Sequence, residues 1–219
     1  MTLYGMPKKI TALVFDMDLT LYSNPVYGQV QIDNLIAIAG KQRGWSLEKT
    51  KQEIEKAQKG WAAAHNGTKP SLSNIICSWG FTMEENVRWR ENAYEPEKFL
   101  SRDEKLRNSL ISLQEFSLGI VTNNPVSIAK RTLACLGVED CFSALVGLDT
   151  LMIAKPHKLP FIKITELLNK NPENCVSIGD RYEIDLEIPL EMGMGGILVK
   201  SVEDVYALPR ILSAQMSYG

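Results

Sequence analysis

Histidine is scarce in this sequence, and its cysteines are not paired. Only His65 and His157 occur among the 219 residues, too few and too widely separated to suggest a zinc site or a Ser-His-Asp triad. The four cysteines stand singly among apolar neighbours without a CxxC pair, which is typical of buried, reduced thiols: Cys77, Cys135, Cys141 and Cys175. Any chemistry is therefore expected to depend on carboxylates.

The chain also lacks a long run of one charge and a long apolar run near its start. Its 24 basic and 26 acidic residues give a formal net charge of -2, which argues against a nucleic acid polymer or an anionic membrane as the main partner. Lys8 and Lys9 precede only five apolar residues, far fewer than a secretory signal or a membrane span needs. We expect a cytoplasmic protein.

From residue 116 onward, short apolar runs alternate with segments of helical period. This alternation predicts βαβ units and a parallel sheet, in a doubly wound, Rossmann-like α/β fold. The expected strands are 8–16, 116–122, 144–148, 175–180 and 196–200, and the expected helices are 126–136, 158–169 and 185–192.

A long insertion separates the first strand from the second. Its spacing is helical and contains no convincing strand pattern. We predict a catalytic core at 1–22 and 100–219 and a smaller all-helical cap domain at 23–99. The cap contains every tryptophan, and we expect at least two of the four to pack internally: Trp45, Trp61, Trp79 and Trp89. The helical segments are 31–44, 47–65, 71–80 and 82–94.

The first strand ends in two acids, in the motif FDMDLT at residues 15–20. In an extended segment Asp16 and Asp18 would point to the same side, and Thr20 would continue the series. A single Asp after a strand often caps a turn, but this accounts poorly for two acids at alternate positions. A divalent cation would relieve their repulsion, and an all-oxygen environment favours Mg²⁺.

Polar residues also follow the later strands. Because the carboxyl ends of parallel strands share one edge of a sheet, these residues are expected to meet in one crevice. Pro125 is expected to open a helix with Asn as its cap, which would leave backbone N–H groups free to bind an anion. The residues in question are Thr122, Asn123, Asn124, Lys155, Asp180 and Asp185.

The ordered set DxDxT, T-N-N, K-P and G-D-x-x-x-x-D resembles the motifs of the haloacid dehalogenase-like superfamily of phosphohydrolases. The resemblance covers nearly the whole chain, with the cap inserted after the first motif. The TLY sequence after the acids is similar to the branch that contains pyrimidine 5′-nucleotidases and phosphoglycolate phosphatases. Within the cap the resemblance is one of position and helical character.

The resemblance implies catalytic or binding roles for five residues of the first three motifs. Asp16 would attack phosphorus and form an aspartyl-phosphate. Asp18 would protonate the leaving alcohol and then activate water. Thr122 and the backbone N–H of Asn123 would hold the phosphoryl oxygens, and Lys155 would offset the negative charge.

The resemblance also implies a Mg²⁺ site. The Asp16 carboxylate, the main-chain carbonyl of Asp18 and Asp180 would be its ligands. Asp185 would lie behind the ligands and support them, or would itself bind the ion occasionally. Thr20 would fix the turn and orient its neighbours.

Asp18 separates the reactions of the family, because the dehalogenases lack it and the phosphonate-cleaving members replace it with a small residue. A Mg²⁺-dependent phosphatase is favoured, with a small phosphorylated metabolite as its partner and a nucleoside monophosphate as the leading guess. A sugar-phosphate mutase is an alternative, although mutases usually have glycine at the position of Leu19. A regulatory protein that only binds is a third. A monomer or a homodimer is expected.

Several positions depart from the pattern of the family. Pro189 is expected to bend or shorten the helix after the fourth motif. Arg181 could reach the substrate, but an ion pair is at least as well supported. Three cap residues are candidates for contact with a second anionic group of the substrate, although a solvated helix face is favoured for each: Lys69, Arg88 and Arg90.

Overall fold

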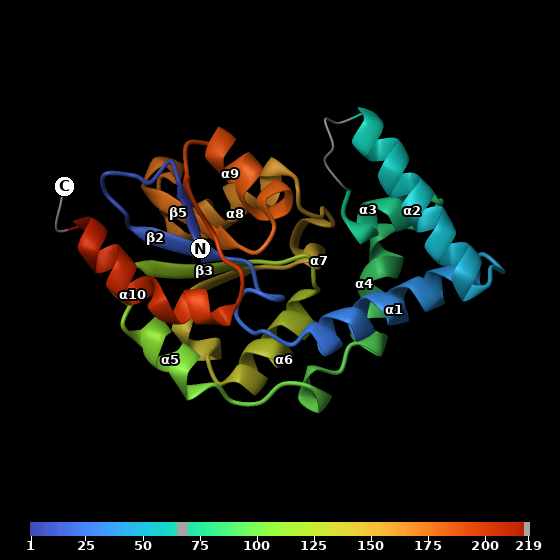
Figure 1. Ribbon diagram of the computed structural model, residues 1–219, viewed down its shortest axis with the longest axis horizontal. Coiled ribbons are helices and arrows are strands. Elements are labelled where there is room, and N and C mark those ends of the chain that lie inside the picture. Colours follow the sequence, from blue (N-terminus) through green and yellow to red (C-terminus); the bar gives the residue numbers. More distant parts are fainter. Residues whose placement is uncertain (65–69, 217–219) are drawn as a thin grey trace.

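The computed structural model describes residues 1–64 and 70–216, so that His65 and Lys69 lie outside the described residues. Its centre is a single six-stranded sheet with the order β1-β6-β5-β2-β3-β4 (Figure 1). All the pairings are parallel except that of β1 with β6. The strands are β1 (Thr2–Tyr4), β2 (Ala12–Phe15), β3 (Ser117–Val121), β4 (Ala144–Val146), β5 (Cys175–Gly179) and β6 (Gly195–Leu198).

The five strands expected from the sequence are therefore confirmed, and so is the mostly parallel, Rossmann-like fold. The sequence analysis missed β1, a strand of three residues that adds to the edge of the sheet through β6. Its three residues are too few to show an alternating pattern.

Helices cover both faces of the sheet, which buries the central strand completely. Leu13 and Phe15 of β2 join a core with α5 (Glu104–Ile111), α6 (Val126–Leu136) and α10 (Val202–Met216). Ala12 and Val14 face the opposite core with α8 (Lys158–Leu168). Figure 1 shows these two layers, with α9 (Glu187–Glu191) on the side of α8. This double burial explains why β2 is a continuous apolar run.

Short elements connect the strands at the edge of the sheet. The expected helix at 185–192 is divided into a π-helix, η4 (Tyr182–Leu186), and the five-residue α9 that contains Pro189. The shortened helix predicted from Pro189 is thus confirmed. The other short elements are α7 (Leu148–Leu151), η1 (Pro96–Lys98), η2 (Glu139–Cys141) and η3 (Pro172–Asn174).

Helices are the only regular elements in the described residues of the insertion, which lies beside the sheet in Figure 1. It contains α1 (Pro25–Gln42), α2 (Leu47–Ala64), α3 (Leu72–Ser78) and α4 (Met83–Ala93). The division into a core at 1–22 and 100–219 and a cap at 23–99 stays a prediction.

Two tryptophans of the insertion pack against its buried cores, as expected. Trp79 and Trp89 contact the cluster around Leu35 and Ile76. Trp45 lies edge-on to Trp79 with ring centroids 5.2 Å apart, whereas Trp61 is 42% exposed.

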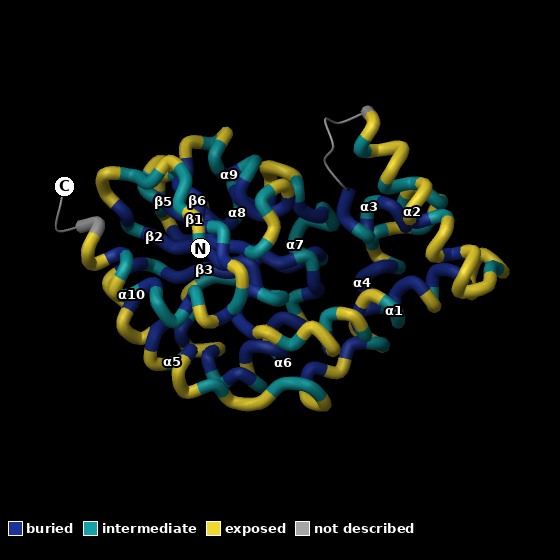
Figure 2. The backbone as a smooth tube through the Cα atoms, in the orientation of Figure 1, coloured by how far each residue is buried: buried dark blue, intermediate teal, exposed yellow. Residues whose placement is uncertain are grey.

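Two further expectations concern the thiols and the membrane. All four cysteines are free, as expected; Cys141 and Cys175 are buried, whereas Cys77 and Cys135 are only half-buried. None of the helices among the described residues is long and apolar enough to cross a membrane. Figure 2 shows that burial is concentrated in the strands and in the helix faces turned toward them.

Two helical glycines of the insertion provide a matched test of its packing. A Cβ at Gly40 of α1 would lie 2.1 Å from Oγ1 of Thr50 in α2, whereas a Cβ at Gly60 would meet no described atom within 4 Å. Gly40→Ala should therefore lower the free energy of unfolding by about 1–3 kcal/mol through overpacking. Gly60→Ala should raise it by about 0.5–1 kcal/mol. Urea denaturation measures both, and equal effects would contradict the close contact between α1 and α2.

Candidate active site

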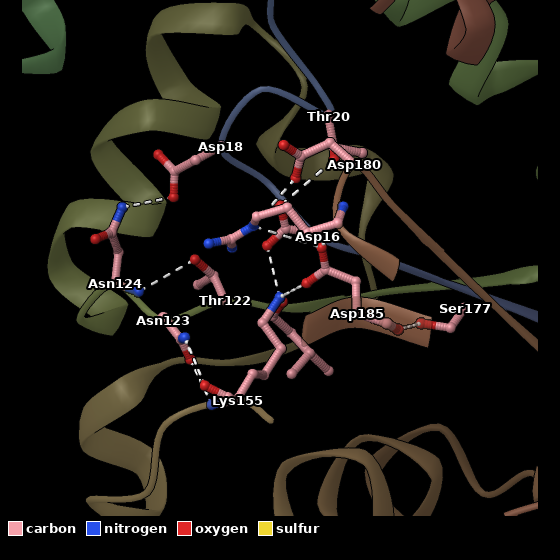
Figure 3. Close-up of polar contacts among 12 residues, drawn as sticks. Asp16, Asp18, Thr20, Thr122, Asn123, Asn124, Lys155, Ser177, Asp180 and Asp185 are labelled. Atoms are coloured by element: carbon pink, nitrogen blue, oxygen red, sulfur yellow. Dashed lines mark hydrogen bonds and ion pairs between the residues drawn. The ribbon is translucent and has the colours of Figure 1, made fainter. Parts of the chain in front are cut away.

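The carboxyl ends of three neighbouring strands carry the candidate residues. Asp16 follows β2, Thr122 follows β3 and Asp180 follows β5. Because β2 lies between β5 and β3, these residues meet at one edge of the sheet. Lys155 reaches the same point from the segment between α7 and α8 (Figure 3). The crevice expected from the sequence is therefore present.

Lys155 is the centre of this cluster and is 1% exposed. Its Nζ donates hydrogen bonds to Asp16 Oδ1 at 2.6 Å, to Asp185 Oδ1 at 2.7 Å and to the Val121 carbonyl at 2.9 Å. Burial alone would lower the pKa of Lys155, but the charges of Asp16 and Asp185 outweigh burial and raise it above its ordinary value. The ammonium therefore stays charged.

The backbone of Lys155 is held as firmly as its side chain. Its N–H donates to Asn123 Oδ1 at 2.7 Å, and Asn123 Nδ2 donates back to its carbonyl at 3.1 Å. The Asn123 amide thus ties the Lys155 segment to the end of β3. Sequence reasoning gave this position a backbone role only.

Three carboxylates surround a space that could hold a metal ion. Oxygens of Asp16, Asp180 and Asp185 lie within 4.8 Å of one another. Burial raises the pKa of Asp16 to about 7, in spite of Lys155, and also raises the pKa of Asp180. Oδ1 of Asp180 is buried and accepts no hydrogen bond from the described residues. An all-oxygen set with an unsatisfied acceptor fits Mg²⁺.

Asp185 contacts Lys155 at nearly the same distance as Asp16 does. Besides its bond to Lys155, its Oδ2 accepts from the backbone N–H of Arg181 at 3.1 Å, and its carbonyl accepts from Ser177 Oγ at 2.7 Å. The Arg181 side chain is 48% exposed and pairs with Asp180 at 3.6 Å and with Asp185 at 3.9 Å. The ion-pair interpretation of Arg181 is confirmed.

The Asp18 carboxylate is held apart from the Lys155 cluster (Figure 3). It accepts hydrogen bonds from Tyr22 OH at 2.5 Å, Asn124 Nδ2 at 2.8 Å and Gln31 Nε2 at 3.4 Å. Burial and the neighbouring Asp18 both raise the pKa of Tyr22, which keeps its hydroxyl a donor.

The expected alternation of the motif ends with the strand. β2 stops at Phe15, and residues 18–21 form a turn in which the Leu21 N–H donates to the Met17 carbonyl. Thr20 therefore does not continue an extended series. Its hydroxyl reaches back to Asp16 Oδ2 at 3.4 Å, which agrees with the supporting position expected for it.

The helix after β3 starts differently from the prediction. Pro125 occupies the N-cap position rather than the first turn, and no Asn side chain in the described part of the chain caps the helix. The free N–H of Val126 is taken by Asp149 Oδ1 at 2.8 Å instead. Asn124 is not available as a cap because its amide contacts Asp18 and Arg90, while its own N–H donates to Thr122 Oγ1 at 3.1 Å.

A cavity of about 590 Å³ opens between this edge of the sheet and the helices of the insertion. Asp18, Asp180 and Arg181 line its polar side. The helices α1, α2 and α3 line its other side with four apolar residues, called the apolar wall below, and with polar Gln31, Gln58 and Ser73 among them. The apolar wall is Ile32, Ile36, Ile54 and Leu72.

Arg90 is the residue that sequence reasoning placed wrongly. A solvated helix face was expected for Lys69, Arg88 and Arg90; Arg88 is exposed as expected, and Lys69 lies outside the described residues. Arg90, in contrast, lines the cavity and is only 7% exposed. Its guanidinium donates to Asn124 Oδ1 at 3.0 Å, which places it two hydrogen bonds from Asp18.

A family model described as haloacid dehalogenase-like hydrolase matches residues 10–193 of this chain. The chain belongs to this family. It is 26% identical over 185 residues to the phosphoglycolate phosphatase of Pectobacterium atrosepticum, across 78% of this chain and 72% of that protein. The haloacid dehalogenase-like chain spans about a third of the length of the first curated relatives that it matches, which are also phosphoglycolate phosphatases.

Solved structures show the same fold for the haloacid dehalogenase-like chain. A HAD phosphatase from Thermococcus onnurineus superposes with a TM-score of 0.59 at 17% identity, covering 93% of this chain and 98% of that one. A β-phosphoglucomutase from Clostridium difficile also gives 0.59, at 19% identity over 95% of this chain and 98% of that one. These likenesses establish the fold and do not choose between the two reactions.

Removal of the buried ammonium should strongly destabilise this haloacid dehalogenase-like protein. Lys155→Met leaves Asp16 and Asp185 buried without their shared cation, and we expect the free energy of unfolding to fall by about 3–5 kcal/mol. Lys130→Met, an exposed position on α6, should change it by less than about 0.5 kcal/mol. Urea denaturation compares them, and equal stabilities would show that Lys155 is not the structural centre of the site.

Proposed function

We propose that this protein is a Mg²⁺-dependent phosphatase that acts on a small phosphorylated metabolite through an aspartyl-phosphate. The observation that carries the proposal is the contact of 2.6 Å between buried Lys155 and Asp16, with Asp18 facing the adjoining cavity. The Asp16 carboxylate is fixed beside the Lys155 ammonium. The Asp18 carboxylate, two residues later in the sequence, lies on the wall of the cavity. Phosphoryl transfer through a covalent intermediate requires these two functions.

Asp16 is proposed as the nucleophile. Its Oδ1 is held by Lys155, whereas Oδ2 accepts, within residues 1–64 and 70–216, only a long hydrogen bond of 3.4 Å from Thr20. An Asp16 oxygen attacks phosphorus, the bond from phosphorus to the ester oxygen breaks, and an aspartyl-phosphate forms. Thr122 and the backbone N–H of Asn123 are proposed to hold the phosphoryl oxygens, and the Lys155 charge offsets theirs.

Asp18 is proposed to move the proton in both halves of the reaction. As the ester bond breaks, protonated Asp18 gives its proton to the leaving alcohol and becomes a carboxylate. The carboxylate then takes a proton from the water that attacks the aspartyl-phosphate, which releases inorganic phosphate and restores Asp16. The position of Asp18 on the cavity wall suits contact with both the alcohol and the water.

Mg²⁺ would be held by the Asp16 carboxylate, the Asp18 main-chain carbonyl and Asp180, with Asp185 as a neighbouring or occasional ligand. When bound, the ion would neutralise charge on the phosphoryl oxygens. Oδ1 of Asp180 accepts no hydrogen bond from the described residues and lies 3.6 Å from Arg181 Nε, which leaves it free to bind the ion and supports this assignment. Asp185 is already occupied by Lys155 and the Arg181 backbone, which favours a supporting position for it.

A nucleoside monophosphate is the proposed substrate class. A cavity of about 590 Å³ with an apolar wall suits a ligand that has a sizeable, partly apolar leaving group. Phosphoglycolate, which the names of the curated relatives indicate, has only a two-carbon acid beyond its phosphate and would leave most of that wall uncovered.

A panel of phosphorylated metabolites tests the proposed activity. Mg²⁺-dependent phosphate release should be fastest with nucleoside monophosphates, and Asp16→Asn should reduce it by at least about 10³-fold because the nucleophile is lost. Asp33→Asn, which alters an ion pair with Lys51 in the insertion, is the control that should keep full activity. Phosphatase activity that survives Asp16→Asn would contradict the proposed mechanism. Isomerisation of a substrate faster than phosphate release would identify a mutase instead.

Metal binding can be measured without turnover. Because Mg²⁺ would relieve the repulsion among the carboxylates, saturating Mg²⁺ should raise the thermal unfolding midpoint by roughly 5–10 °C. Asp180→Asn should remove most of this rise. Asp140→Asn, which removes an exposed acid paired with Arg107, should retain it. An unchanged rise in Asp180→Asn would exclude Asp180 as a ligand.

A further inference from the structure

We infer that Arg90 of α4 is a positioning residue that acts through Asn124 to fix the place of the Asp18 side chain, which is proposed to take a proton from water. This inference rests on the proposed function, since it concerns the second half of that reaction. It connects a helix of the insertion to the proposed acid and base by two consecutive hydrogen bonds.

Arg90 is fixed by several partners at once. Besides Asn124, its guanidinium donates to Tyr94 OH at 3.1 Å and to Ser73 Oγ at 2.9 Å, and its Cζ lies 5.6 Å from the centroid of the Tyr94 ring. A side chain that is 7% exposed and bound on three sides has little freedom to turn toward a substrate. Its position in the cavity wall therefore favours action on a protein neighbour.

The direction of the hydrogen bonds determines how Asn124 is oriented. A guanidinium can only donate, so the amide oxygen of Asn124 must face Arg90. The amide nitrogen must then face Asp18, to whose Oδ2 it donates at 2.8 Å. The Asn124 backbone is also anchored, through Thr122 Oγ1 at 3.1 Å and through the Leu148 N–H at 2.9 Å.

Asp18 consequently receives donors on both of its oxygens. Tyr22 OH donates to Oδ1 at 2.5 Å, and Asn124 Nδ2 donates to Oδ2 at 2.8 Å. These two donors fix the position of the Asp18 side chain on the cavity wall. Without Arg90 the Asn124 amide could reverse and present its oxygen to the Asp18 oxygen. Two acceptors that face each other repel, which would displace Asp18 from the place where it meets the attacking water.

Burst kinetics with p-nitrophenyl phosphate test this inference, because nitrophenolate leaves readily without a proton. Arg90→Met, which cannot donate a hydrogen bond, should lower kcat by about 10-fold or more, while kcat/KM changes by less than about 3-fold, since only hydrolysis of the aspartyl-phosphate is slowed. Stopped-flow traces should then show a burst of about one nitrophenolate per active site. Arg90→Lys, which can still donate to Asn124, should recover much of kcat.

Three further variants make the test specific. Asn124→Ala should produce the same burst, and the Arg90→Met/Asn124→Ala double variant should be no slower than the slower single variant, because both residues act along one path. Asn124→Ala and Arg90→Lys decide the question if Arg90→Met does not fold. Arg88→Met, at an exposed arginine two residues earlier on α4, is the matched control and should behave as wild type.

The failures of the inference and of the proposed function are distinguishable. Parallel losses of kcat and kcat/KM without a burst, in a wild-type protein that Asp16→Asn inactivates, would overturn the inference and assign Arg90 to packing or substrate binding. Strictly additive losses in the double variant would also overturn it. A wild-type protein without phosphatase activity would overturn both.

Discussion

The buried ammonium of Lys155 is the constraint on which the rest of the site depends. An ion removed from water loses several kcal/mol of hydration, which only close and well-directed partners offset. Lys155 finds them in Asp16, Asp185 and the Val121 carbonyl, which come from the ends of β2 and β3 and from η4 after β5. The same contacts that keep the cation charged therefore fix the relative positions of three chain segments. They leave three carboxylates close to one ammonium, and this excess of negative charge is why the cluster suits a divalent cation.

Two adjacent asparagines divide the site into two halves. The amide of Asn123 binds the backbone of Lys155 on the sheet side, and the amide of Asn124 binds Asp18 on the cavity side. Two successive side chains thus support the nucleophile half and the proton-transfer half of the proposed reaction. The second half also involves the insertion, since Gln31 contacts Asp18 directly and Arg90 contacts it through Asn124. The proton-transfer half consequently depends on how the insertion is placed, whereas the Lys155 half depends on the sheet.

The parts that sequence predicts well are those governed by local pattern. The apolar runs predicted five of the strands. Because the carboxyl ends of parallel strands lie at one edge of the sheet, the sequence also predicted that four polar residues lie close together: Asp16, Thr122, Lys155 and Asp180. Local pattern says less about partners distant in the chain, and for that reason Asp149 as the cap of α6 was missed. Arg90 is the clearest case. It belongs to α4, a helix that is polar overall, and its burial depends on Asn124, which lies 34 residues away in the sequence. Val87 and Tyr94, three and four residues from Arg90, mark the buried face on which it lies, and this spacing was the available signal.

The structure separates the residues that would determine the reaction from those that would determine the substrate. The Lys155 cluster is formed by strand ends whose spacing the hydrogen bonds of the sheet fix. The apolar wall of the cavity is formed by helices whose side chains need only remain apolar to pack against one another. A change at Ile36 or Ile54 would therefore reshape the cavity without moving the carboxylates, whereas a change at Lys155 would disturb Asp16 and Asp185 directly. Arg90 and Asn124 lie at the boundary between these two parts. Through these two residues the position of the insertion can influence the proton transfer. Helix α4 therefore has a proposed part in the chemistry as well as in the shape of the cavity.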